Sequence, residues 1–178
     1  MPKRCLVVNR LDAYDADFLE LRIDLMEKVD PRSVQKWLEG KTVILTYRSP
    51  VDASLFQELA LLDFAYIDID IRDLSNLPPK LPLILSYHNF HSTPDLDPLL
   101  AEMRTIPAAV YKIASWAESL DDSFRMIEFV TQKSQDNICI TGLTMGPFMG
   151  PTRSFTSNPD TWCIYEFASP ELVMNRLT

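Results

Sequence analysis

The chain has 178 residues, of which 47% are hydrophobic and 24% charged, and its formal net charge is −8. This is enough apolar material for one substantial core, and the length favours a single domain over residues 1–178. The acidic balance argues against a nucleic-acid partner, which requires a basic face. No apolar run approaches the roughly 20 residues that cross a bilayer, and the start lacks a secretory signal, so we expect a cytoplasmic protein without a membrane partner.

Three cysteines, Cys5, Cys139 and Cys163, stand far apart in apolar runs with strand character. Their odd number and wide spacing favour neither a disulfide framework nor a metal site. We therefore expect three reduced thiols in the core.

Eight short runs rich in β-branched, leucine or aromatic residues have strand character. They are 4–8, 18–24, 42–48, 65–71, 83–89, 109–114, 138–144 and 162–168. Four segments between them have helical periodicity: 31–39, 53–63, 95–103 and 120–133. Alternating strands and helices predict an α/β fold with a parallel sheet, and eight strands favour a closed (β/α)8 barrel.

The connections between the predicted strands are short for this fold, since such a barrel usually takes about 250 residues. A parallel crossover needs about a dozen residues, and the gaps 9–17 and 72–82 leave no room for a full helix with its loops. We therefore expect a trimmed barrel with reduced connections after the first and fourth strands. A doubly wound open sheet is the structural alternative, although the chain has no Gly-rich phosphate loop.

Charged side chains interrupt the predicted strands. Alternation in the second strand puts Glu20, Arg22 and Asp24 on one face, Arg48 ends the third strand, and His88 ends the fifth. Both faces of a parallel sheet are covered, so such charges require an interior partner or a ligand. Each one alone also fits a structural role, but active sites of these barrels lie at the carboxyl ends of several strands.

Lys112 lies inside the sixth predicted strand, with apolar residues on both sides. Loss of hydration there favours the neutral amine, the form that Schiff-base chemistry on a ketone requires. Histidine ionises near neutral pH, so His88 is a matching acid/base group. The structural alternative for Lys112 is a side chain that extends from the strand end to solvent.

A set of motifs, in one order along nearly the whole chain, resembles type I 3-dehydroquinate dehydratases. The motifs are Glu20-Leu-Arg22-Ile-Asp24, Thr46-Tyr-Arg48, Tyr66-Ile-Asp68-Ile-Asp70, Ser86-Tyr-His88-Asn-Phe90 with Thr93-Pro94, Tyr111-Lys112-Ile-Ala, Gly142-Leu-Thr-Met145-Gly146 with Thr152-Arg153-Ser154, and Ala168-Ser169-Pro170. The resemblance implies a lyase that removes water from 3-dehydroquinate to give 3-dehydroshikimate in the shikimate pathway of aromatic amino acid biosynthesis. It also implies that no metal or organic cofactor takes part.

The resemblance implies catalytic roles for three residues. Lys112 forms an imine with the substrate ketone, and the iminium acidifies the neighbouring carbon–hydrogen bond. His88 removes that proton and later protonates the departing hydroxyl, while Asp70 orients His88.

Five further residues match substrate-binding positions of the family. Glu20, Arg22 and Arg48 line the site, Arg153 binds the substrate carboxylate through its planar guanidinium, and Ser169 helps to close over the substrate.

The chain departs from the family pattern in several places. Asp70 stands where the family usually has glutamate, no Gly-Gly follows Arg48, and the helix after the first strand is nearly absent. The family's closing segment Ala-Ser-Ala-Pro-Gly-Gln is replaced by Ala168-Ser169-Pro170-Glu171, which has no clear counterpart of the glutamine.

Two other functions remain open from the sequence. A Schiff-base aldolase would share Lys112, but it would more often carry a phosphate-binding loop after the last strands, and the prolines of 147–151 cannot donate backbone N–H groups. A barrel that binds a small carboxylate without catalysis is the second. The resemblance is compatible with a homodimer and with fusion to a shikimate dehydrogenase domain.

Overall fold

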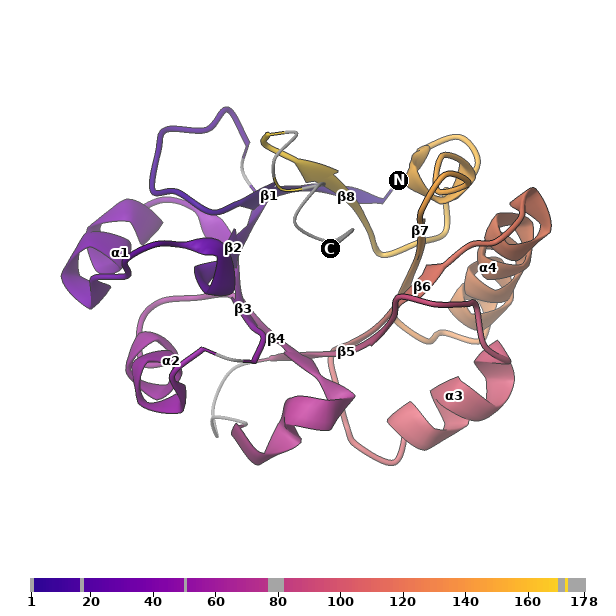
Figure 1. The fold of residues 1–178 in the computed structure, drawn as a ribbon, viewed down its shortest axis with the longest axis horizontal. Helices are drawn as coiled ribbons and strands as arrows, with labels where there is room; N and C mark the ends of the chain where they lie inside the picture. The colour runs from indigo at the N-terminus through magenta and orange to yellow at the C-terminus, as the bar shows by residue number, and fades with distance from the viewer. Residues whose placement is uncertain (1, 17, 50, 77–81, 170–171, 173–178) are drawn as a thin grey trace. The chain divides into compact units, whose positions relative to one another are not determined.

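A computed structural model describes residues 2–16, 18–49, 51–76, 82–169 and 172 (Figure 1). The chain divides into two compact units. The first unit consists of Met1–Lys3, Asp70–Arg72 and Leu83–Ile164. The second consists of Arg4–Ile69, Asp73–Pro82 and Tyr165–Thr178.

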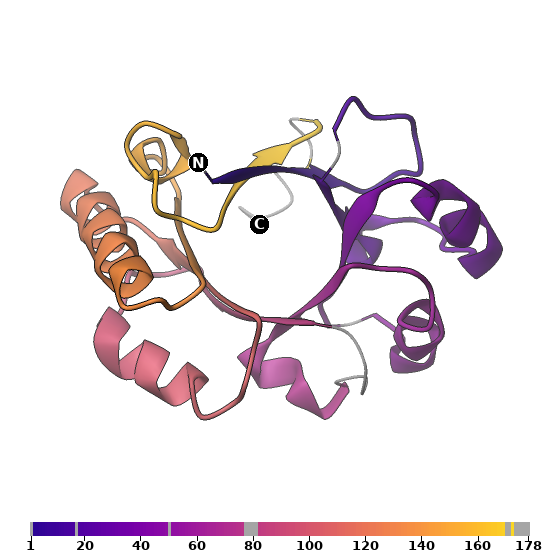
Figure 2. The same ribbon diagram turned by 180° about the vertical axis from the view of Figure 1, so that it is seen from behind.

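The first unit contains three parallel strands, β5 (Leu83–Asn89), β6 (Val110–Trp116) and β7 (Ile140–Met145), hydrogen-bonded in that order. Helices α3 (Leu96–Met103) and α4 (Leu120–Gln135) lie on the same face of these strands, as Figures 1 and 2 show. Consecutive residues of these strands are buried, so side chains on both strand faces are covered, which explains the continuous apolar runs.

Helix α4 begins where the sequence predicts it because its first turn is capped. Ser119 accepts a hydrogen bond from the Asp122 backbone N–H, and the Asp122 carboxylate accepts from the Ser119 N–H. The helix then buries Met126, Phe129 and Val130, which recur at helical spacing and form its face toward β7.

The second unit contains the parallel strands β1 (Lys3–Val8), β2 (Phe18–Arg22), β3 (Thr42–Tyr47) and β4 (Tyr66–Asp70), paired in chain order. The residue after β8 (Cys163–Phe167) donates its N–H to a carbonyl of β1. The interior of this unit is built from the fully buried leucines and isoleucines of these strands.

Two helices cover the second unit, α1 (Pro31–Leu38) and α2 (Ala53–Leu59), and both lie on one face of β2 and β3 (Figure 1). Asp30 and Asp52 cap them by accepting backbone N–H groups of the first turn. Together with α3 and α4, they confirm all four predicted helices.

All eight predicted strands are confirmed, but the second is shorter than expected. It ends at Arg22, and the chain then turns into the 3-10 helix η1 (Ile23–Leu25), which contains Asp24. The prediction that Asp24 shares a strand face with Glu20 is therefore wrong. After the turn, Asp24 binds the Arg22 guanidinium through both carboxylate oxygens.

The reduced connections after the first and fourth strands are confirmed. Residues 9–16 contain no helix, and in the described part of the connection after β4, residues 71–76, the chain forms the 3-10 helix η2 (Ile71–Asn76). The sequence reading did not single out a third one: residues 146–162 contain only the 3-10 turn η3 (Pro151–Arg153). Proline lacks the N–H group that continues a helix, so Pro147 and Pro151 account for the short turn.

Cys5 and Cys163 are buried, and Cys139 is exposed, so the prediction of three core thiols is wrong for Cys139. β7 begins at Ile140, two residues after the start of the predicted run at 138, which leaves Cys139 just before the strand. None of the three forms a disulfide. Within the described ranges, no helix has both the length and the hydropathy to cross a bilayer.

Candidate active site

Lys112 is buried in the middle of β6, with an exposed fraction of 1%. This excludes the alternative of a side chain that extends to solvent. Its register partners are Ser86 on β5 and Thr141 on β7, and both are fully buried. Register partners in a parallel sheet point to the same face, so these three polar side chains form one row, which we call the lysine row. The Thr141 hydroxyl has no hydrogen-bond partner among the residues that the structure describes.

His88 lies two residues beyond Ser86 on β5 and therefore points to the same face as Lys112. The strand rise and spacing put the Cα atoms of His88 and Lys112 about 8 Å apart. The His88 ring is buried, and its Nδ1 lies 2.9 Å from Asp70 Oδ2. Phe90 stacks on the ring at a centroid distance of 6.2 Å.

Asp70 is the last residue of β4 and is buried. Burial alone would raise the pKa of its carboxyl, but hydrogen bonds from His88 and Arg72 outweigh burial and hold the pKa well below its usual range. Asp70 therefore stays ionised and fixes Nδ1 of the imidazole. Proton exchange with a substrate then falls to Nε2 of His88.

The sequence reading missed Arg72, which binds both carboxylate oxygens of Asp70. Its Nε lies 2.7 Å from Oδ1 and its Nη2 lies 2.9 Å from Oδ2. The only signal in the sequence is the Asp70-Ile-Arg72 spacing after a strand, and that spacing brings the two side chains together only because the 3-10 helix η2 starts there.

Arg153 is half-buried on η3, which is held against β7 by a buried hydrogen-bond network. Thr152 Oγ1 accepts from the Thr144 N–H at 3.0 Å and donates to the Met149 carbonyl at 3.0 Å. Asn158 donates its amide to carbonyls of both β7 and η3. The network fixes the backbone position of Arg153, although η3 belongs to the connection between β7 and β8.

Glu20 and Arg22 lie on β2 and Arg48 directly follows β3, and each contacts a polar or charged side chain of the second unit. Buried Glu20 accepts a hydrogen bond of 2.7 Å from Thr46. Arg22 binds both oxygens of Asp24, at 2.7 and 2.5 Å. Arg48 donates to a carboxylate oxygen of Asp68, on β4, at 2.8 Å. Buried charges require such partners, so these carboxylates hold the arginines in place.

Ser169 is half-buried after β8, and its carbonyl accepts the Leu172 N–H at 3.2 Å. Glu171, which follows Pro170 in the closing segment, lies outside the described residues. The first unit thus holds the predicted residues Asp70, His88, Lys112 and Arg153. The second holds Glu20, Arg22, Arg48 and Ser169.

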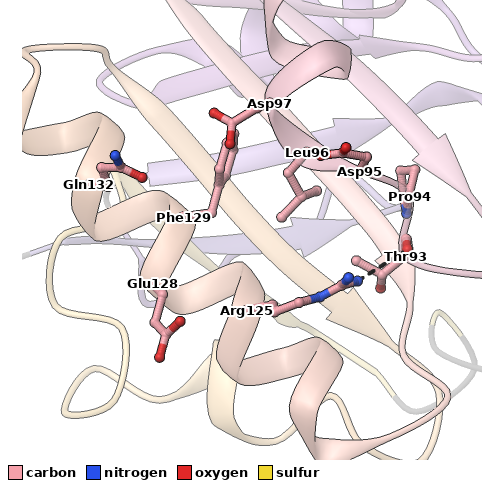
Figure 3. Close-up of a pocket in the computed structure, with 9 residues that line it drawn as sticks. All are labelled: Thr93, Pro94, Asp95, Leu96, Asp97, Arg125, Glu128, Phe129 and Gln132. Atoms are coloured by element: carbon pink, nitrogen blue, oxygen red, sulfur yellow. Dashed lines mark hydrogen bonds between the residues drawn. The ribbon is translucent and has the colours of Figure 1, made fainter.

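A surface groove of about 480 Å³ lies between the start of α3 and the side of α4 (Figure 3). Its lining is Thr93, Pro94, Asp95, Leu96, Asp97, Arg125, Glu128, Phe129 and Gln132. It contains neither Lys112 nor His88, and Arg125 reaches across it to the Thr93 carbonyl. The groove is therefore separate from the candidate active site.

Solved structures share this fold over nearly the whole chain. The 3-dehydroquinate dehydratase from Enterococcus faecalis superimposes with a TM-score of 0.76 at 18% identity, covering 99% of this chain and 92% of that one. The predicted (β/α)8 barrel is thereby confirmed, and the open doubly wound sheet is wrong. The fold is thus that of a (β/α)8 barrel, in which active sites lie at the carboxyl ends of the strands.

Sequence comparisons identify the family. Residues 3–158 match the type I 3-dehydroquinase family. The 3-dehydroquinate dehydratase of Coxiella burnetii is 30% identical over 88% of this chain and 84% of its own length. A bifunctional 3-dehydroquinate dehydratase/shikimate dehydrogenase of Arabidopsis thaliana is 28% identical over 81% of this chain and 28% of its own length. The chain belongs to the type I 3-dehydroquinase family, as the motifs predict.

Proposed function

We propose that this chain is a lyase that dehydrates 3-dehydroquinate to 3-dehydroshikimate, a step of the shikimate pathway. The observation that carries the proposal is the buried Lys112 on the strand beside the His88–Asp70 pair, in a chain of this family. The lysine itself acts as the electron sink, so the reaction calls for no metal or organic cofactor.

Lys112 acts first. Its neutral amine adds to the substrate ketone, and loss of one water with uptake of one proton from solvent, which the final hydrolysis returns, gives an iminium ion bonded through Nζ. The iminium withdraws electrons from the neighbouring carbon–hydrogen bond and so acidifies it. Burial of Lys112 supports this role because it holds the amine in the core, on the strand beside the His88–Asp70 pair.

His88 acts second, through Nε2. It removes the proton next to the iminium carbon and then returns a proton to the departing hydroxyl, which leaves as water. A second water hydrolyses the imine, releases the product and regenerates the amine, so the net change is loss of one water. The Asp70 contact supports this role because it fixes the ring and stabilises the transient imidazolium.

Five residues are proposed to bind substrate: Glu20, Arg22, Arg48, Arg153 and Ser169. The arginines support this assignment through their planar guanidinium groups, which suit a carboxylate. Arg153 takes the substrate carboxylate, since η3 holds it on a buried network. The carboxylate partners of Arg22 and Arg48 orient those side chains toward hydroxyl groups rather than a second anion.

We further propose that residues 1–178 act as one barrel domain in the cytoplasm. The structural match over 99% of the chain supports one domain. The Arabidopsis relative supports fusion to a shikimate dehydrogenase domain as one form in which such a barrel occurs, and a homodimer is the other.

Borohydride trapping tests the proposal. Reducing a mixture of the protein and 3-dehydroquinate should leave a covalent mass gain on Lys112, and Lys112→Ala should show none. His88→Ala should still form the adduct but turn over about 10²–10⁴-fold more slowly. Absence of an adduct in the unmodified chain would contradict both the dehydratase and the aldolase. An adduct without ultraviolet absorbance from an enone product would instead favour a binding barrel.

A further inference from the structure

Arg72 is the side chain that completes the surroundings of Asp70. Its guanidinium meets both carboxylate oxygens, its backbone N–H donates to Oδ1 at 3.1 Å, and its Nη2 also donates to the His88 carbonyl at 3.3 Å. Asp70 thus accepts from Arg72 on one side and from the His88 ring on the other. Arg72 therefore connects the end of β4 to the backbone carbonyl of His88. Through Asp70 it also acts on the His88 ring.

Arg72 holds the carboxylate of Asp70 in place. Asp70 Oδ2 meets the His88 ring while Arg72 binds both carboxylate oxygens. Two parallel guanidinium hydrogen bonds define both the distance and the plane of a carboxylate. Arg72 can supply them from two residues away because η2 turns the chain back at the end of β4.

The charge of Arg72 acts in addition to its geometry. A cation beside Asp70 offsets part of the negative charge of the carboxylate, and that charge would otherwise stabilise the protonated imidazole. Asp70 contacts the His88 ring and Arg72 binds Asp70, both from the β4–η2 segment, while Lys112 lies on the same face from β6. Arg72 disfavours a proton on His88, and Asp70 favours one.

We propose that Arg72 is a positioning residue for the general acid/base: it fixes the carboxylate that orients His88 and moderates how strongly that carboxylate holds the imidazole's proton. This inference rests on the proposed function. It assigns no contact between Arg72 and substrate, since the arginine acts through Asp70.

Arg72→Gln removes the charge and the paired hydrogen bonds, and Arg72→Lys keeps the charge without the paired geometry. We expect kcat to fall about 10–100-fold in Arg72→Gln, with little change in KM and with the Lys112 adduct still trapped by borohydride. The acid limb of the kcat–pH profile should move upward by about half a pH unit. Arg72→Lys should lose turnover but keep the limb near its original pH.

Arg125→Gln is the matched control. Arg125 is also exposed, also binds an aspartate, and also donates to a backbone carbonyl, but it lies in the groove between α3 and α4. We expect this variant to keep the kcat and pH profile of the unmodified chain. Urea unfolding of all variants then separates a loss of folded protein from a loss of turnover.

A nuclear magnetic resonance titration makes the test independent of activity. The chain has two histidines, and exposed His91 provides the reference signal beside His88. The titration midpoint of His88 should rise in Arg72→Gln. An unmoved midpoint, or turnover within twofold of the unmodified chain, would overturn the role of Arg72. Failure to trap an adduct in the unmodified chain would instead overturn the proposed function, and the midpoint would still report on the Arg72 contact.

Discussion

Gly142 lies in β7 where α4 packs most closely, and an alanine side chain has no room there. A Cβ atom at this position would lie 2.5 Å from Val130 Cγ2 and 2.6 Å from Met126 Sδ. Carbon atoms in contact prefer about 3.5–4.0 Å, so the overlap with Val130 is about 1 Å. Methionine can change rotamer, but a valine in a helix is restricted to one. Gly142→Ala must therefore displace α4 from the sheet.

The expected cost of Gly142→Ala follows from two opposing terms. Overpacking a buried site costs about 1–3 kcal/mol, and replacing glycine in a strand regains about 0.5–1 kcal/mol of backbone entropy. We expect a net loss of about 1–2 kcal/mol in the free energy of unfolding, measured by urea denaturation. Each kcal/mol should lower Tm by about 2–4 °C.

Gly150→Ala is the control for Gly142→Ala, since Gly150 is exposed, has helical backbone angles and has no atom within 4 Å of a new Cβ. It should be neutral or slightly stabilising. Val130→Ala removes the clashing methyl, so Gly142→Ala should cost less in that background. A Gly142→Ala variant within about 0.5 kcal/mol of the unmodified chain, or strict additivity with Val130→Ala, would refute the packing argument.

Two further predictions concern the network under Arg153 and the charge of Asp70. Thr152→Val leaves the buried Thr144 N–H without its acceptor, so it should cost about 1–3 kcal/mol of stability and raise KM, whereas exposed Thr156→Val should do neither. The folded-state pKa of Asp70 is lowered, so its ionised form contributes stability above the ordinary aspartate range near pH 3.9 that is lost as pH falls toward the folded-state pKa. The stability difference between the unmodified chain and Asp70→Asn, measured by urea unfolding, should thus be larger at about pH 6 than at about pH 3, and the opposite trend would contradict the assignment.

The strands and helices could be predicted because each carries a local signal. Runs of β-branched and aliphatic residues match strands buried on both faces, and Ser119 with Asp122 fixes the start of α4 at the right residue. The position of Cys139 could not be predicted in the same way. Apolar residues already precede β7 at Ile138 and Cys139, and the alternation of apolar residues does not mark Ile140 as the first residue of the strand.

The residues of the candidate site likewise differ in whether a local sequence signal predicts them. Lys112 and Glu20 stand out in the sequence because a charge inside an apolar run is costly to bury, so it indicates a buried partner or a functional role. Arg72 and the Arg22–Asp24 pair do not stand out, because their contacts arise from 3-10 turns directly after strands. Periodicity describes extended and helical segments, but the direction of a side chain on such a turn depends on dihedral angles that it does not encode.

The side chains of the lysine row also fill space in the core. Ser86 and Thr141 are small, and the four methylene groups of Lys112 occupy the layer between them. The side chain that carries the proposed nucleophile is therefore also the largest of the three side chains in the lysine row. Removing it opens a cavity as well as deleting an amine, whereas methionine keeps most of the bulk. Comparing alanine with methionine at this one position thus separates the chemistry of the lysine from its contribution to the core.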